Sequence, residues 1–398
     1  MLMEMGIVGK PNVGKSTFFC AATLAPAEIA EYPFTTIEAN RGITYVRAKC
    51  PHTELGVECN PNNAPCENGT RLVPVEMLDV AGLVPDAHKG RGLGNKFLDD
   101  LRQAKALIHI VDASGGTDHE GNIVELGSHD PLSDVQFLDT EISQWMKGIL
   151  EKGWKKVVRQ IQLEGLKLEK AIQERMTGLG FTDSMVLEAL RQTEINEKPM
   201  NWSEDDVLRL ADSLRRVGKP MIIAANKCDI TPDENIRRLT SLKEKIVVPT
   251  SAESELALRR AAKSNLISYN VGDDHFEILD ESKLNEKQLK GLRFVSNVLK
   301  RFGNTGIQKC VEDAIFNLLN MIVVYPVEDE NKWTDKDGRV LPDAYLLPRG
   351  SNAKDLAYEV HTELGDNFIR AIDGRTKRVV GADHELKDED IMTIVARA

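Results

Sequence analysis

The sequence predicts an α/β fold, doubly wound around a mostly parallel sheet, with a helical insertion and a small C-terminal α+β domain. Short apolar runs at 5–8, 75–78 and 221–225 each lead directly into a polar or glycine-rich segment, as buried parallel strands do. From about 135 to 176, apolar residues recur at helical spacing, and a second helical group is predicted over about 183–192 and 203–217, with Ser203 as a helix cap. From residue 321 onward, short strand-like runs surround one helix, which predicts a separate small sheet.

Length and composition limit the possible classes of protein. The chain has 398 residues, which at about 100–200 residues per domain suggests two to three domains. No run of about 18 apolar residues occurs, and no secretory signal is evident, so we expect a cytoplasmic protein without a membrane partner. The 51 Lys and Arg residues against 62 Asp and Glu give a net charge of −11, so any RNA contact requires a local basic patch.

The first apolar run is followed by a predicted phosphate-binding loop. Residues 9–16 fit the pattern G-x-x-x-x-G-K-S, between a strand and a helix expected over about 17–24. Lys15 would neutralise charge on the β- and γ-phosphates, and the Ser16 hydroxyl would coordinate Mg²⁺. The helix presents its positive N-terminal end to the same anion. The predicted phosphate-contacting residues are Asn12, Val13, Gly14, Lys15, Ser16 and Thr17.

Two further segments complete the predicted nucleotide site. The run at 75–78 ends in Asp79, which would hold Mg²⁺ through water, and Gly82 would offer its N–H to the γ-phosphate. The run at 221–225 delivers a base-reading motif, in which the carboxylate of Asp229 would accept two hydrogen bonds from guanine. Adenine lacks these donors, so discrimination in favour of GTP and GDP is expected. The other residues predicted to contact the base are Asn226, Lys227, Ser251 and Ala252.

The motifs divide the chain into four predicted segments. A P-loop GTPase domain would occupy 1–134 and, after the interruption, 218–320. The helical insertion would span 135–217, and the C-terminal domain 321–398. An ordinary domain of this class bridges the interruption with one or two helices and a strand, so the insertion is unusually long.

The motifs also resemble a known family. Residues 32–37 (YPFTTI) resemble switch I of the Obg family of translation-associated GTPases, and 79–84 (DVAGLV) with 90–98 (GRGLGNKFL) resemble its switch II. Residues 348–356 and 386–391 resemble a TGS domain of β-grasp fold, as in the archaeal and eukaryotic branch. The related YchF-type ATPases depart from N-K-x-D at the base motif, which this sequence keeps. The resemblance therefore implies GTP rather than ATP.

The resemblance implies roles for individual residues as well. Thr36 would bind Mg²⁺ and sense the γ-phosphate, and with Lys15 and Gly82 it forms the predicted catalytic set. Leu83 stands where Ras-type enzymes have a water-orienting glutamine, so slow hydrolysis without a partner is expected. Asn12 resembles the asparagine that helps to bind K⁺ in some such GTPases.

The cysteines fall into two groups. Cys20, Cys228 and Cys310 lie within predicted elements and are expected to pack as small hydrophobic residues. The other three share a loop with a histidine, and together they could supply a Cys₃His zinc site: Cys50, His52, Cys59 and Cys66. No C-x-x-C pair is present, so free surface thiols or one disulfide remain alternatives.

The insertion carries local positive charge. Residues 145–176 contain eight basic and four acidic residues, a net charge of +4 in an acidic chain. A helical hairpin with a solvated charged face explains this pattern, and so does a basic arm that docks on ribosomal RNA. The resemblance favours ribosome or RNA contact through this arm and the TGS domain. Two alternatives to the GTPase remain: an Obg-like ATPase, and a nucleotide-gated binding module with negligible turnover.

Overall fold

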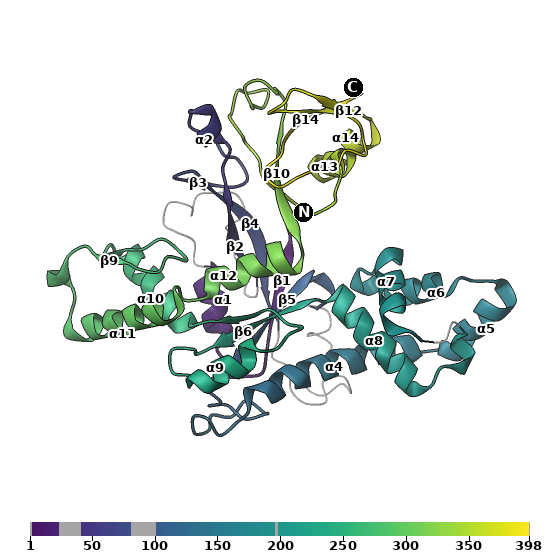
Figure 1. Ribbon diagram of the computed structural model, residues 1–398, viewed down its shortest axis with the longest axis horizontal. Helices are drawn as coiled ribbons and strands as arrows, with labels where there is room; N and C mark the ends of the chain where they lie inside the picture. The colour runs from purple at the N-terminus through teal and green to yellow at the C-terminus, as the bar shows by residue number, and fades with distance from the viewer. Residues whose placement is uncertain (1, 24–40, 81–100, 196–197, 398) are drawn as a thin grey trace. The chain divides into compact units, whose positions relative to one another are not determined.

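A computed structural model describes residues 2–23, 41–80, 101–195 and 198–397 (Figure 1). The chain divides into two compact units. The core unit comprises residues 4–22 and 77–310, and the C-terminal unit comprises 1–3, 23–76 and 311–398. The switch segments predicted at 32–37 and 90–98 lie outside the described residues.

A parallel sheet forms the centre of the core unit. Strand β1 (Glu4–Val8) pairs in parallel with β5 (Ala106–Asp112), β5 with β6 (Met221–Asn226), and β6 with β7 (Val247–Pro249). The end of β4 (Thr70–Asp79) lies on the other side of β1. Strands β5 and β6 are buried along their whole length, as their continuous apolar sequences require. The predicted α/β class is confirmed.

Helices connect these strands, and a small hairpin completes the core unit. The connecting helices are α1 (Lys15–Thr23), α4 (Pro131–Glu151), α8 (Glu204–Gly218), α9 (Asp233–Thr240), α10 (Ala252–Lys263) and α11 (Glu286–Phe302). The hairpin is β8 (Ile267–Ser268) with β9 (Glu277–Ile278), followed by the 3₁₀ turn Glu281–Lys283. No described helix is both long and apolar enough to cross a membrane.

The helical insertion is built on the pair α4 and α8. Between them lie α5 (Trp154–Glu164), α6 (Leu168–Met176) and α7 (Asp183–Thr193), with 3₁₀ turns at Thr177–Leu179 and Pro199–Asn201. Their shared core includes Met146, Ile172, Val186, Leu210 and Leu214.

Two details of the insertion compare directly with the sequence. Ser203 caps α8 in a capping box with Asp206, as predicted. The helical pattern over 135–176 is broken into three helices, because Gly153 and Gly165 adopt positive φ angles of 71° and 68°. An apolar periodicity continues across such breaks, so it does not reveal them.

The C-terminal unit contains a long hairpin segment and a small mixed sheet. Strand β2 (Arg41–Lys49) leads through α2 (His52–Leu55) to β3 (Cys66–Glu67), which pairs antiparallel with β4. Helix α12 (Ile307–Glu312) and the π-helical turn Asp313–Leu318 precede the sheet, whose strand order is β11-β10-β14-β12-β13. The strands are β10 (Met321–Val327), β11 (Tyr345–Pro348), β12 (Phe368–Asp373), β13 (Val379–Val380) and β14 (Ile391–Ala396).

One helical layer covers this sheet. Helices α13 (Ala353–Val360) and α14 (Thr362–Asp366) follow β11, and Leu356 packs into a core with Ile322, Ala371 and Met392. A five-stranded mixed sheet in which β10 and β14 run parallel, with a helix across it, is the β-grasp arrangement that the resemblance to a TGS domain implied.

Candidate nucleotide-binding site

The phosphate loop connects β1 to α1 through backbone conformations that favour glycine. Gly9 has φ 153° and Gly14 has φ 97°. A Cβ atom at Gly9 would lie 2.6 Å from the carbonyl oxygen of Ile110, and one at Gly14 would lie 2.4 Å from Nδ2 of Asn226. Both distances are shorter than any tolerable contact, so the two glycines of the motif are required by the packing beneath and beside the loop.

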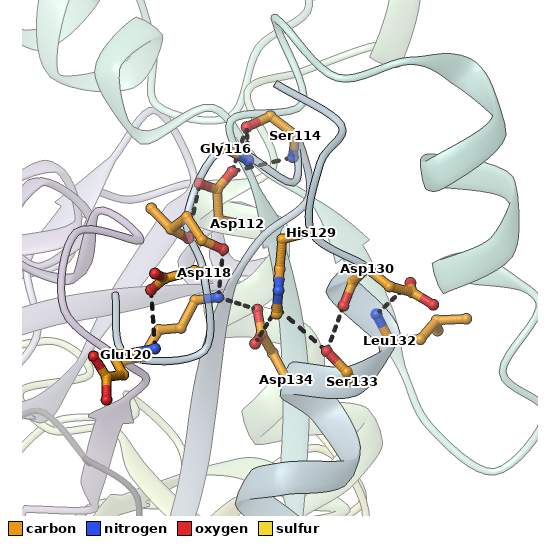
Figure 2. A network of polar contacts seen from close by, with 12 residues as sticks. Asp112, Ser114, Gly116, Asp118, Glu120, His129, Asp130, Leu132, Ser133 and Asp134 are labelled. Carbon is orange, nitrogen blue, oxygen red and sulfur yellow. Dashed lines mark hydrogen bonds and ion pairs between the residues drawn. The ribbon is translucent and has the colours of Figure 1, made fainter. Parts of the chain in front are cut away.

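A buried network fixes the outer side of the loop. The Lys10 ammonium lies 2.7 Å from Oδ2 of Asp134 and donates a hydrogen bond to the carbonyl of Thr117 at 2.8 Å. His129 Nε2 lies 2.8 Å from the other oxygen of Asp134 (Figure 2). Asn12 donates from Nδ2 to the carbonyl of Gly121 at 2.9 Å. The segment between β5 and α4 therefore supports the loop, a role that no sequence motif indicated.

Asp112, at the end of β5, links this segment to the base motif. Its carboxylate accepts hydrogen bonds from the N–H and hydroxyl of Ser114, at 3.1 and 2.5 Å, and from the Thr117 hydroxyl at 3.1 Å (Figure 2). The same carboxylate forms an ion pair of 2.8 Å with Lys227. Lys227 of the predicted base motif therefore contacts protein on the side of β5.

Lys15 and Asp79, predicted to contact phosphate and magnesium, interact with each other electrostatically. Lys15 Nζ donates to the carbonyl of Lys10 at 2.8 Å, within the loop itself. Burial lowers the pKa of Lys15, and the negative charge of Asp79, at the end of β4, acts in the opposite direction. Ser16 is exposed at the start of α1, next to Thr17. Thr36 and Gly82, the other predicted catalytic residues, lie outside the described residues.

Asn226 joins three predicted parts of the site. Its Nδ2 donates to the carbonyl of Val13 in the phosphate loop at 2.9 Å, and its Oδ1 accepts from the N–H of Ala252 at 3.1 Å. Ser251, which precedes α10, is buried and bonded through its hydroxyl to Ser254 at 2.8 Å. The structure thus brings together the phosphate loop, the base motif and the segment predicted to close over the base.

Asp229 lies in a loop whose main chain is hydrogen-bonded to Arg301. Arg301, on α11, donates to the carbonyls of Cys228 and Thr231 at 3.2 and 3.1 Å, on both sides of Asp229. The Asp229 side chain is half-buried and borders a mostly apolar cavity of about 400 Å³ between α10 and α11. Among the described residues its carboxylate has no hydrogen bond or ion pair. The Asp229 carboxylate is therefore available to accept hydrogen bonds from a ligand.

The isolated cysteines differ from the sequence prediction at one position. Cys228 and Cys310 are buried, as predicted, and burial raises the pKa of the Cys228 thiol to about 12. Cys20 is exposed, contrary to the prediction, because α1 buries Phe18, Ala21 and Ala22 and turns Cys20 to the opposite face.

The predicted Cys₃His residues come together in the C-terminal unit. The ligand atoms of Cys50, His52, Cys59 and Cys66 all lie within 4.8 Å of one another. Cys50 is buried, and the other three are partly buried. The residues present could hold a metal ion.

The geometry of the core unit is that of a P-loop GTPase domain, and the comparisons with known proteins agree. The model of the 50S ribosome-binding GTPase family matches residues 4–147, that of the Obg-like GTPase YGR210-like, G4 motif-containing domain matches 224–329, and that of the TGS domain matches 333–396. A GTP-binding protein of Methanocaldococcus jannaschii is 55% identical over 99% of both chains. The ribosome-binding ATPase YchF of Bacillus subtilis is 32% identical, over 68% of this chain and 72% of its own length.

A solved structure is similar to this chain over nearly its whole length. The GTP-binding protein from Pyrococcus horikoshii is 45% identical, with a TM-score of 0.80 over 99% of this chain and 100% of that one. The chain belongs to the Obg-like family of P-loop GTPases. The resemblance inferred from the switch and TGS motifs is confirmed.

Proposed function

We propose that this protein binds guanine nucleotides with Mg²⁺ and hydrolyses GTP to GDP and phosphate. The observation that carries the proposal is the Asp229 carboxylate, which is held by a fixed loop and has no partner among the described residues. Guanine offers it two donors, N1–H and the 2-amino group. Adenine offers none in that position, and a carboxylate left unpaired against it costs binding free energy.

The residues of the phosphate site suit Mg²⁺ and a triphosphate. The Ser16 hydroxyl and the Asp79 carboxylate are hard oxygen ligands of the kind that Mg²⁺ prefers, and Thr36 would complete the set. When bound, the ion neutralises negative charge that spreads over the transferred phosphoryl group. Lys15 would share that task, together with the loop N–H groups and the N–H of Gly82, while water attacks in line.

Removing the Asp229 side chain tests the base assignment. We expect Asp229→Ala to weaken GDP and GTP binding by roughly 100-fold, because two hydrogen bonds of about 1.5 kcal/mol each are lost, and to leave ATP binding unchanged. Titration calorimetry with GDP, GTP and ATP in the presence of Mg²⁺ measures all three affinities. Asp205→Ala, an exposed aspartate on α8, is the matched control and should bind as wild type does. Equal or tighter binding of ATP by the wild-type protein would instead identify an Obg-like ATPase.

Ribosome docking through the insertion is the second part of the proposal. Of the eight basic residues in 145–176, Lys147 forms ion pairs with Glu151 and Glu204, and Arg175 donates to main-chain carbonyls at the end of α4. The remaining six are exposed: Lys152, Lys155, Lys156, Arg159, Lys167 and Lys170. Six exposed cations between the end of α4 and the first half of α6, of which Lys170 also donates to Gln173, suit a phosphate backbone. The B. subtilis relative is described as ribosome-binding.

Turnover and docking can be tested together. Without ribosomes we expect a rate of about 10⁻³ s⁻¹ or less, because Leu83 cannot orient the attacking water, and ribosomes should accelerate it. Because Asn12 is proposed to help hold K⁺, the assay is run in KCl and in NaCl.

In co-sedimentation, a non-hydrolysable GTP analogue should support more ribosome binding than GDP does.

Charge reversal locates the docking surface. Replacing Lys155, Lys156 and Arg159 on α5 by glutamate should reduce co-sedimentation roughly tenfold. The same change at Lys287, Lys290 and Arg293, exposed on α11, is the matched control. Equal loss in both variants would argue against the insertion as the docking surface. Analogue-dependent binding without measurable turnover would favour the nucleotide-gated binding module.

A further inference from the structure

We propose that one structural Zn²⁺ ion fastens the segment between β2 and β4 and is bound by four of its side chains: Cys50, His52, Cys59 and Cys66. The site goes beyond the proposed GTPase activity and does not depend on it. All four residues, and all the contacts that argue for the ion, belong to the C-terminal unit.

The distances between the ligand atoms fit a tetrahedral zinc ion. With Zn–S of about 2.3 Å and Zn–N of about 2.05 Å, a regular tetrahedron places two sulfur atoms about 3.8 Å apart and a sulfur and a nitrogen about 3.5 Å apart. The Sγ atoms of Cys50 and Cys59 lie 3.8 Å apart, and Sγ of Cys66 lies 3.6 Å from Nδ1 of His52. A disulfide requires an S–S distance of about 2.05 Å and would use only two of the four converging groups.

The backbone brings these residues together without a C-x-x-C pair. Asn68 and Gly69, with φ angles of 47° and 84°, form the tight turn of the β3–β4 hairpin, which positions Cys66 in β3. The N–H of Cys50 donates to the carbonyl of Gly69 at 2.8 Å, so the end of β2 is held against that turn. The hairpin turn therefore places Cys50 and Cys66 close together, and this explains how ligands that are widely spaced in the sequence form one compact site.

The charge around the cluster favours a metal over free thiols or a disulfide. Arg71 is fully buried, and its guanidinium nitrogen lies 3.3 Å from Sγ of Cys50. No carboxylate of the described residues forms an ion pair with it. A Zn²⁺ ion with three thiolates and a neutral histidine carries a net charge of −1, which balances the guanidinium. The Asp343 carboxylate interacts electrostatically with Arg71 without forming an ion pair. With neutral thiols or a disulfide, the guanidinium would lose the negative charge of the metal cluster beside it, at considerable cost.

The ion would stabilise the loop 56–65 and also its hydrogen bonds to residues 340–344. Residues 56–65 have no helix or strand, yet their backbone and side chains form hydrogen bonds with residues 340–344 of the same unit. Asn60 N–H donates to the Val340 carbonyl at 2.9 Å, and Asn62 N–H donates to the Pro342 carbonyl at 2.6 Å. A short segment with little apolar core needs another source of order, and a structural metal ion supplies it.

Metal analysis of the full chain tests the site directly. Protein purified without chelators or a polyhistidine tag is expected to contain one zinc ion per chain by mass spectrometry. Cys59→Ser and Cys66→Ser should each reduce this to below about 0.2 per chain. Cys20→Ser, which removes an exposed thiol from α1, is the matched control and should keep one. Chelation of the wild-type zinc should also expose residues 56–65 to limited proteolysis.

Several results would overturn the proposal. The first is wild-type protein that neither contains zinc nor takes it up in the presence of reductant. The second is protein that contains iron in place of zinc. The third is a count of four free thiols rather than six after denaturation without reductant, which would indicate a disulfide. Retention of zinc in both serine variants would also contradict it. Because the wild-type measurement needs no variant, poor folding of a variant does not obscure the answer. Nucleotide affinity is measured separately, so failure of the GTPase proposal leaves this test intact.

Discussion

Gly14→Ala is expected to weaken binding of GDP and GTP by at least about 1000-fold. The backbone at this position has φ 97°, which alanine rarely adopts, and the new methyl group would lie 2.4 Å from Nδ2 of Asn226. Relief of that overlap must break the hydrogen bond from Asn226 to the Val13 carbonyl, which holds the base motif against the phosphate loop. Titration calorimetry with GDP and Mg²⁺ measures the loss.

The control for this variant is Gly148→Ala. Gly148 lies in α4, and a Cβ atom there meets nothing within 4 Å. Alanine should therefore leave nucleotide binding unchanged and stabilise the protein by roughly 0.5–1 kcal/mol, because it restricts the unfolded chain and favours the helix. Affinity of Gly14→Ala within tenfold of wild type would mean that the loop adopts another conformation when it binds a nucleotide.

The parts of the site that the sequence predicted are those encoded by local pattern. The apolar runs before Gly9, Asp79 and Asn226 indicated parallel strands, and such strands place their carboxyl ends at one edge of a sheet. The hydrogen bond from Asn226 to the Val13 carbonyl follows from that arrangement of the strands. The sequence spacing alone could not measure it, since 213 positions separate the two residues.

The parts that the sequence did not reveal depend on tertiary partners. Lys10 occupies a variable position of the loop motif, and only the structure shows it buried against Asp134 and Thr117. Arg71 lies in an apolar strand, where nothing in the pattern indicates a buried guanidinium. The Cys₃His set was visible by residue type, whereas its convergence depends on the Asn68–Gly69 turn and on the bond from Cys50 to that turn.

Arg71→Met is expected to destabilise the C-terminal unit by about 3–5 kcal/mol, the usual cost of removing one partner of a buried polar network. The guanidinium donates to the carbonyls of Ala64 and Leu341 at 3.0 and 2.8 Å, and it lies 5.5 Å from the centre of the Tyr325 ring. Methionine fills similar space but cannot donate, so two buried carbonyls lose a donor. Urea denaturation, followed by hydrogen exchange of the backbone amides in this unit, measures the change.

Two comparisons give this result its meaning. Arg339→Met replaces a half-exposed arginine that pairs with Asp335 in the same unit, and it should change the free energy of unfolding by about 1 kcal/mol or less. Zinc removal from the wild type and from Arg71→Met forms the second comparison. If the guanidinium balances the charge of the metal cluster, burying it lowers the stability of the metal-free protein more than that of the zinc-loaded protein. Arg71→Met should therefore destabilise the protein less after chelation than before it. An equal loss with and without zinc would restrict Arg71 to its carbonyl and ring contacts.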